Sequence, residues 1–151
     1  MTHGESDVRN LVYASCLALD REDYSSYLNL FTEDLNYRVV TYSPELKTEM
    51  TWLEHDNSEM KHLIKMLPQH VKMKGKFFRH VTVYDATQHA DAWEALSYLT
   101  LSYTDLDGNT KLLAVGAYED VIKTERNELK IDSRTVRLET RVLGPGIHVP
   151  L

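Results

Sequence analysis

The first part of the chain carries apolar residues at helical spacing. Between residues 5 and 19 they recur at steps of three and four: Val8, Leu11, Val12, Cys16 and Leu19. This spacing puts the apolar side chains on one face and predicts an amphipathic helix.

Two further helices are predicted before residue 70. Asp20 is expected to cap a short second helix, and Asp23 lies three residues after this cap. Its apolar stripe would be Tyr24, Leu28 and Phe31, or Tyr27 and Leu30. Asp56, Asn57 and Ser58 are candidate N-caps of a third helix, which Pro68 is expected to stop. The apolar face of this helix would consist of Met60, Leu63, Ile64 and Leu67.

The remaining segments read as strands. Leu35, Tyr37, Val39 and Thr41 alternate with the residues between them, which predicts a strand over residues 35–42 that ends before Pro44. Residues 48–53 predict a second short strand. Residues 77–87, 92–103, 111–123 and 129–142 are rich in β-branched and aromatic side chains and predict four long strands. Asp107-Gly108 predicts a hairpin turn, and residues 125–128 predict a second one. Strands of this length must bend, and Gly116 is a candidate bulge or kink.

The order of these elements predicts an α+β fold in one domain, residues 1–151. About three helices from the N-terminal half would close the concave side of a cone-shaped, strongly curved antiparallel sheet. A chain of 151 residues with 42% hydrophobic residues is large enough for a packed core.

Charge and cysteine content exclude several function classes. The net charge of −6 argues against nucleic-acid binding, and the short basic cluster formed by Lys72, Lys74, Lys76 and Arg79 reads as a solvated start of a strand. The single Cys16 has no partner for an internal disulfide, and no signal peptide or long apolar run precedes the first helix. These features favour a cytoplasmic protein without a membrane segment.

The spacing of the histidines does not match that of metal ligands. The seven lie at positions 3, 55, 62, 70, 80, 89 and 148. None belongs to a His-x-x-x-His pair or to a two-histidine, one-carboxylate array, and no Cys-x-x-Cys pair is present. Phosphate-binding loops and the Gly-x-Ser-x-Gly signature of hydrolases are missing as well. The sequence therefore predicts no metal site and no cofactor in this chain.

A pocket inside the cone remains as a possible place for chemistry. Asp34, Tyr37, Arg79 or His80 could point into it. An aspartate or histidine that is desolvated beside a tyrosine can have a pKa suited to proton transfer, as a dehydratase or isomerase requires. Sequence alone does not place these side chains inward.

Three stretches resemble the small, or β, subunits of Rieske-type aromatic-ring-hydroxylating oxygenases, within the nuclear-transport-factor-two-like cone superfamily. Residues 19–37 are similar to the family's opening, in which an acidic, tyrosine-bearing helix runs into Phe-x-x-Asp-x-x-Tyr. Phe77-Phe78-Arg79-His80-Val81 is similar to the start of its long strands. Residues 137–151 resemble its ending, with Glu139 where the family often has Asp. Trp52 followed by Asp56 resembles the corresponding stretch in the subgroup that acts on carboxylated or sulfonated substrates.

The resemblance implies a structural subunit without an active site of its own. The Rieske two-iron two-sulfur cluster and the mononuclear iron would lie in a separate large, or α, subunit. The small subunits would form a homotrimeric base within a hetero-hexamer, and the ordered tail would take part in its contacts. The candidate interface residues are Arg137, Arg141, Leu143, Pro145, His148, Pro150 and Leu151. Arg137 and Arg141 would share one face of a strand and could pair with carboxylates of a neighbour.

Three functions follow for testing. The leading hypothesis is the non-catalytic subunit of an aromatic-catabolic dioxygenase or monooxygenase. The alternative is a self-sufficient cone enzyme, a dehydratase or isomerase that uses Asp34, Tyr37 or His80. A homo-oligomeric binding module without turnover is the third.

Overall fold

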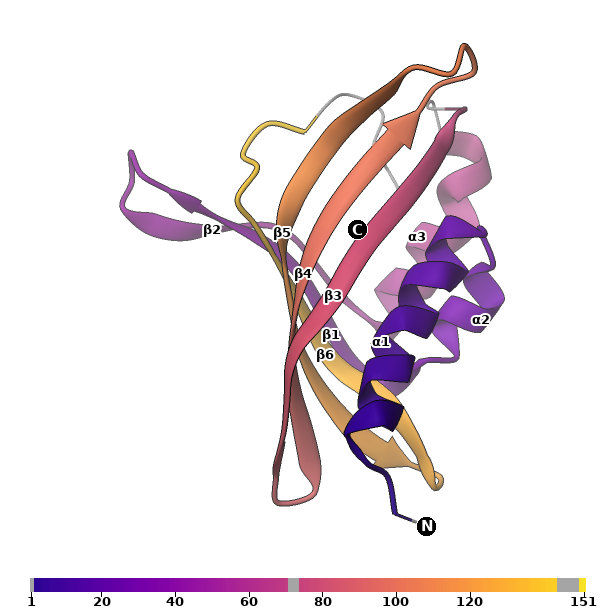
Figure 1. The fold of residues 1–151 in the computed structure, drawn as a ribbon, viewed down its shortest axis with the longest axis vertical. Helices are drawn as coiled ribbons and strands as arrows, with labels where there is room; N and C mark the ends of the chain where they lie inside the picture. The colour runs from indigo at the N-terminus through magenta and orange to yellow at the C-terminus, as the bar shows by residue number, and fades with distance from the viewer. Residues whose placement is uncertain (1, 71–73, 144–149) are drawn as a thin grey trace.

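The computed structural model describes residues 2–70, 74–143 and 150–151, and in these ranges a single mixed sheet packs against three helices (Figure 1). The strand order is β2-β1-β6-β5-β4-β3. The elements in chain order are α1 (Glu5–Asp20), α2 (Tyr24–Leu28), β1 (Phe31–Ser43), β2 (Thr48–Asp56), α3 (Asn57–His70), β3 (Lys76–His89), β4 (Ala92–Thr104), β5 (Thr110–Glu125) and β6 (Glu128–Leu138). The predicted α+β class is confirmed.

Helix α1 buries the face that its spacing predicts. Val8 and Val12 are fully buried, and Cys16 and Leu19 are nearly so. The backbone N–H of Gly4, the N-cap, donates to the Asp7 carboxylate at 2.8 Å and so closes the first turn. The cap expected at Asp20 is wrong, because α1 continues through Asp20 and Asp23 caps α2 by accepting from the Ser26 N–H at 3.2 Å.

Helix α3 begins at one of the predicted caps. The Glu59 N–H donates to the Asp56 carboxylate at 2.8 Å, and the Asp56 N–H donates to the Glu59 carboxylate at 3.1 Å. This reciprocal pair satisfies two N–H groups at the helix start. The helix extends to His70, two residues beyond the Pro68 stop that the sequence predicted.

The sheet differs from the expected one in a single pairing. Four neighbouring pairs are antiparallel, but β1 runs parallel to β6, with Val39 opposite Val136. The three hairpins from β3 to β6 carry the chain back to β1, so that β6 arrives in the same direction as β1. Pairing between the first and last strands is a long-range event that local sequence patterns do not encode.

Irregular positions bend the long strands. The register shifts around Tyr84 of β3, Leu113 of β5 and Asp132 of β6, each of which is an extra residue on its strand. Gly116, the expected bulge, keeps a regular pairing with Leu99 and Leu138. A Cβ atom there would lie 2.4 Å from the Arg137 carbonyl oxygen, so this glycine allows β6 to approach β5 closely.

Both predicted hairpin turns are confirmed. In the β4–β5 turn, Gly108 has a φ of 86°, and the Asp105 carboxylate accepts from the N–H groups of Asp107 and Asn109. In the β5–β6 turn, Arg126 and Asn127 have φ values of 53° and 65°. Positive φ at two central residues matches the right-handed twist of the flanking strands.

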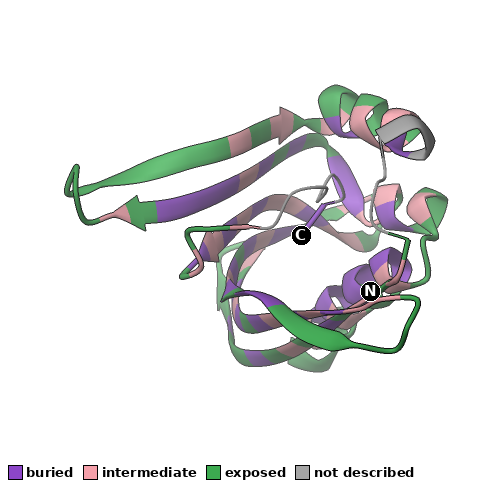
Figure 2. Ribbon diagram, turned by 90° about the horizontal axis from the view of Figure 1, so that it is seen from above, coloured by how far each residue is buried: buried purple, intermediate pink, exposed green. Residues whose placement is uncertain are grey.

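The core lies between the helices and the concave face of the sheet (Figure 2). Along β4 the buried residues Ala95, Ser97, Leu99 and Leu101 alternate with more exposed ones. The end of β1 and most of β2 project from the rest of the molecule as a two-stranded ribbon, and β2 has no buried residue. Within the described ranges, no helix has the length and apolar character needed to cross a membrane.

Candidate functional site

A buried ion pair lies at the centre of the cone. On β6, Arg134 donates from Nε to Asp120 Oδ1 at 2.8 Å and from Nη2 to Oδ2 at 3.0 Å, and both side chains are 0% exposed. Its Nη1 donates to the Ser15 hydroxyl of α1 at 3.0 Å, and the guanidinium lies 4.1 Å from the Tyr118 ring centroid. The bidentate pair therefore connects β5, β6 and α1 inside the core.

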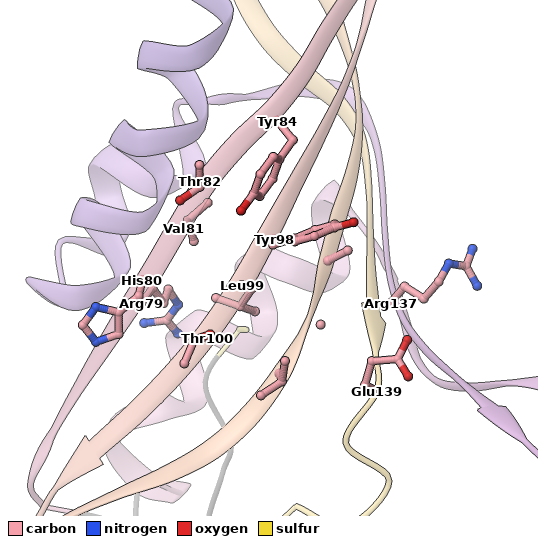
Figure 3. Close-up of a pocket in the computed structure, with 13 residues that line it drawn as sticks. Arg79, His80, Val81, Thr82, Tyr84, Tyr98, Leu99, Thr100, Arg137 and Glu139 are labelled. Atoms are coloured by element: carbon pink, nitrogen blue, oxygen red, sulfur yellow. The ribbon is translucent and has the colours of Figure 1, made fainter.

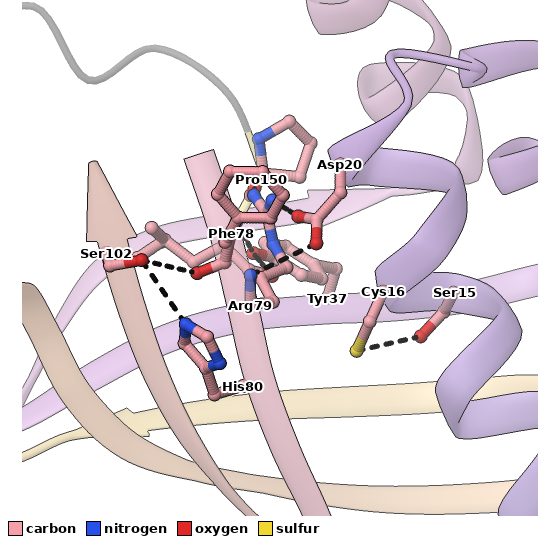
Figure 4. A network of polar contacts seen from close by, with 10 residues as sticks. Ser15, Cys16, Asp20, Tyr37, Phe78, Arg79, His80, Ser102 and Pro150 are labelled. Atoms are coloured by element: carbon pink, nitrogen blue, oxygen red, sulfur yellow. Dashed lines mark hydrogen bonds and ion pairs between the residues drawn. The ribbon is translucent and has the colours of Figure 1, made fainter. Parts of the chain in front are cut away.

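A second buried arginine holds the end of the chain (Figure 4). Arg79 donates from Nη1 to Asp20 Oδ1 at 2.7 Å and from Nη2 to the Pro150 carbonyl at 2.5 Å. The Leu151 N–H donates to the Tyr37 hydroxyl at 2.9 Å, and Leu151 is 4% exposed. Residues 150–151 thus fill part of the space between the helices and the sheet.

Burial raises the pKa values of three groups in this interior, further from neutral pH. It raises the pKa of Tyr37 to about 12. It also raises the pKa values of the Tyr27 hydroxyl and of the Cys16 thiol above their ordinary values. A general acid or base at neutral pH needs a pKa near 7, so burial makes these three groups worse acid–base catalysts.

The proposed acid–base residues are not brought together. Asp34 and His80 are exposed, and the His80 ring contacts the Ser102 hydroxyl at 3.3 Å on the surface. Tyr37 is fully buried and bonded to Leu151. Arg79 does point inward, but its partners are Asp20 and Pro150. This geometry does not favour a dehydratase or isomerase that uses these residues.

An open groove lies on the outer face of the sheet, away from the helices. It measures about 890 Å³, and its lining includes Tyr84, Tyr98 and Val115. The two tyrosine rings lie 4.6 Å apart between centroids, and Figure 3 shows the Arg137 guanidinium pointing away from them. The groove thus combines aromatic and aliphatic side chains with polar ones, which include His80 and Glu139.

The expectation that Arg137 and Arg141 share a strand face is wrong, because β6 ends at Leu138. Arg137 bonds to Glu49 and, at 2.9 Å, to Glu119 of its own chain. Arg141 bonds to Glu45 at 3.4 Å. Within the chain, these two arginines therefore have carboxylate partners, and their part in a subunit interface stays a prediction.

The other predicted interface residues fall into three groups. Leu143 is half-buried against the core. Pro150 and Leu151 are buried in their own chain, and their assignment to a subunit contact stays a prediction. Pro145 and His148 lie outside the described residues, as does Lys72 of the basic cluster.

Sequence reasoning missed the Arg134–Asp120 pair. Asp120 stands between Tyr118 and Ile122 in the alternation of β5, and all three are buried. A charged residue at an inward position was a signal for a buried partner, since an unpaired buried charge is costly. In the ranges 2–70, 74–143 and 150–151, no group of three or more His, Cys, Asp or Glu residues is placed to hold a metal ion.

Comparison with known proteins places the chain in a family. The pattern of the SnoaL-like domain family matches residues 2–135. The chain is 30% identical over 145 residues to the β subunit of 2-aminobenzenesulfonate 2,3-dioxygenase from Alcaligenes sp, covering 95% of this chain and 97% of the relative. It is also 30% identical over 155 residues to the hydroxylase β subunit of methanesulfonate monooxygenase from Methylosulfonomonas methylovora, covering 95% and 85%.

Solved structures share the fold at lower identity. A chain assigned as the β subunit of an aromatic-ring-hydroxylating dioxygenase from Novosphingobium aromaticivorans has a TM-score of 0.83 at 18% identity, covering 97% of this chain and 96% of that one. A chain of naphthalene 1,2-dioxygenase has a TM-score of 0.80 at 17% identity, covering 99% and 88%. The chain belongs to the SnoaL-like domain family and, within it, to the small, or β, subunits of the ring-hydroxylating oxygenase group.

Proposed function

We propose that this chain is the structural, non-catalytic small subunit of a multicomponent oxygenase, acting as one cone domain. The observation that carries the proposal is 30% identity, over almost the whole chain, with each of two oxygenase β subunits. The filled interior supports it, because Arg134, Tyr37 and Leu151 occupy space that an enclosed substrate would need.

The partner is a large, or α, subunit that carries the Rieske cluster and the mononuclear iron. Oxygen activation takes place there, and this chain supplies no ligand to either iron centre. Three small subunits form a base under three large ones, and the complex works in the cytoplasm. The family resemblance supports these points.

The substrate class that we propose is an organosulfonate. The names of both curated relatives specify a sulfonate, one aromatic and one aliphatic. The large subunit selects the substrate, so its pocket and not the cone of this chain would hold the cationic side chains that bind the sulfonate.

The test is co-expression of this chain with a Rieske-containing large subunit encoded beside it, followed by affinity purification through a tag on this chain. We expect the large subunit to co-purify, the complex to contain iron, and the complex to oxidise 2-aminobenzenesulfonate or methanesulfonate with a matched reductase. Purified alone, this chain should contain no stoichiometric iron and should oxidise neither compound. If it binds iron tightly by itself, or never associates with the large subunit, the proposal is wrong.

A further inference from the structure

Strand β3 forms one edge of the sheet, so it has a neighbouring strand on one side only. In an antiparallel pair, alternate residues direct both their N–H and their C=O groups away from the partner strand. A row of such groups at an edge is a template on which a strand of a second molecule can pair. The groups that cover the β3 edge therefore decide whether other molecules can join the sheet there.

Helix α1 lies beside β3 (Figure 1), and three of its polar side chains bond to the backbone of this edge. Arg9 Nη1 donates to the Val83 carbonyl oxygen at 2.5 Å, and the Val83 N–H donates to the Tyr13 hydroxyl at 3.2 Å. The Arg79 N–H donates to the Asp20 carboxylate at 3.1 Å. Both backbone groups of Val83 and the N–H of Arg79 are thus already bonded within the chain.

The periodicity of α1 places these three side chains. Positions 9, 13 and 20 are four and then seven residues apart, so they form one line along the helix. This line runs beside the apolar face of α1, in which Val8 and Val12 are fully buried. Burial of the apolar face therefore holds the polar line against the β3 edge.

The part of the edge that α1 covers ends where β3 becomes irregular. The register with β4 shifts around Tyr84, directly after Val83. A bulge of this kind disrupts the ladder and increases the local twist, which hinders regular pairing with a further strand. The exposed carboxylate of Asp85 follows at once. The regular start of β3, up to Val83, is therefore the part that needs a cover.

We propose that Arg9, Tyr13 and Asp20 prevent strands of other molecules from pairing with the β3 edge. Such a strand would have to break the three hydrogen bonds and displace α1 from its position beside β3. This role goes beyond the proposed function and does not depend on it, because it concerns an edge that the chain covers by itself.

The test is Arg9→Ala combined with Tyr13→Phe, which frees both backbone groups of Val83 and leaves the Asp20–Arg79 pair in place. Sedimentation velocity of the full chain, over a range of micromolar concentrations, should show species larger than any that the parent forms. Their share should rise severalfold over the parent and increase with concentration, and infrared spectra should show intermolecular strands. Tyr13→Phe alone, which removes a single oxygen atom, should produce the same change to a smaller extent.

A third substitution separates edge pairing from a general loss of stability. Val81 lies two residues from both Arg79 and Val83, so its N–H points to the same edge. Adding Val81→Pro to the double variant removes that N–H and should return the size distribution to that of the parent. Val81 is half-buried, so this proline also lowers stability. Association through unfolded protein would therefore increase in the triple variant, whereas association through the edge would decrease.

Arg21→Ala with Tyr24→Phe is the matched control. It deletes the same chemical groups close to the start of β3, and among the described residues neither side chain bonds to the β3 backbone. This control should sediment like the parent. The inference is overturned if the Arg9→Ala, Tyr13→Phe variant sediments like the parent, if the control associates as strongly as that variant, or if the larger species persist after Val81→Pro.

Discussion

Removing one member of the buried Arg134–Asp120 pair should destabilise the protein severely. Arg134→Met leaves the Asp120 carboxylate at 0% exposure without its two guanidinium bonds and leaves the Ser15 hydroxyl without a donor. Breaking a fully buried pair from one side costs about 3–5 kcal/mol. Because whole domains are stable by about 5–15 kcal/mol, this loss is a large share of the total.

The paired substitution tests the reason for that loss. Arg134→Met combined with Asp120→Leu removes both charges, so no uncompensated buried carboxylate remains. Replacing a whole buried pair by apolar residues is often neutral or stabilising. The double variant should therefore be more stable than Arg134→Met alone, with a coupling free energy of about 3 kcal/mol.

The assay is urea unfolding followed by far-ultraviolet circular dichroism at one fixed protein concentration, since self-association would shift the apparent stability. Arg137→Met is the matched control, because its side chain is 40% exposed and its ion pairs contribute at most about 1 kcal/mol. A loss below about 1 kcal/mol for Arg134→Met, or a double variant whose loss equals the sum of the single losses, would refute the reasoning.

Three further substitutions test separate features. Burial raises the pKa of Tyr37 to about 12 against an ordinary value near 10. The contribution of the buried, neutral hydroxyl to the free energy of unfolding is therefore complete below pH 10 and is lost as the pH rises to 12. Urea unfolding of Tyr37→Phe should therefore show a smaller alkaline loss than the parent, by about 2 kcal/mol, and equal pH profiles would contradict this. Gly116→Ala, whose Cβ would meet the Arg137 carbonyl at 2.4 Å, should lose about 1–3 kcal/mol by the same assay, and an unchanged free energy of unfolding would contradict this. Leu151→Ala should lower the unfolding free energy by at least about 2 kcal/mol, and no loss would mean that residues 150–151 are not part of the core.

Local features of the fold were predictable from the sequence. The three- and four-residue spacing identified α1, and Asp107-Gly108 identified the β4–β5 turn, because each depends on residues that are near one another in the chain. The cap of α2 was assigned to Asp20 and not Asp23, an error within the usual uncertainty of element boundaries.

Features that join distant segments were not predictable. Arg79 and His80 occupy opposite faces of β3 because side chains alternate along a strand, but the sequence does not tell which of the two points inward. The burial of Leu151 against Tyr37 depends on contacts between residues 114 positions apart. No periodicity records such contacts.

The parallel pairing of β1 with β6 has a consequence for synthesis of the chain. While the protein emerges from the ribosome, β1 can pair with β2 at once, but its other edge stays open until residues 128–138 have been made. During that time β1, with its apolar residues Leu35, Tyr37 and Val39, has no partner strand on one edge. This open edge can bind a chaperone or pair with a wrong strand. Residues 128–138 must therefore be translated before the nascent subunit can close its sheet and present a finished surface to any partner.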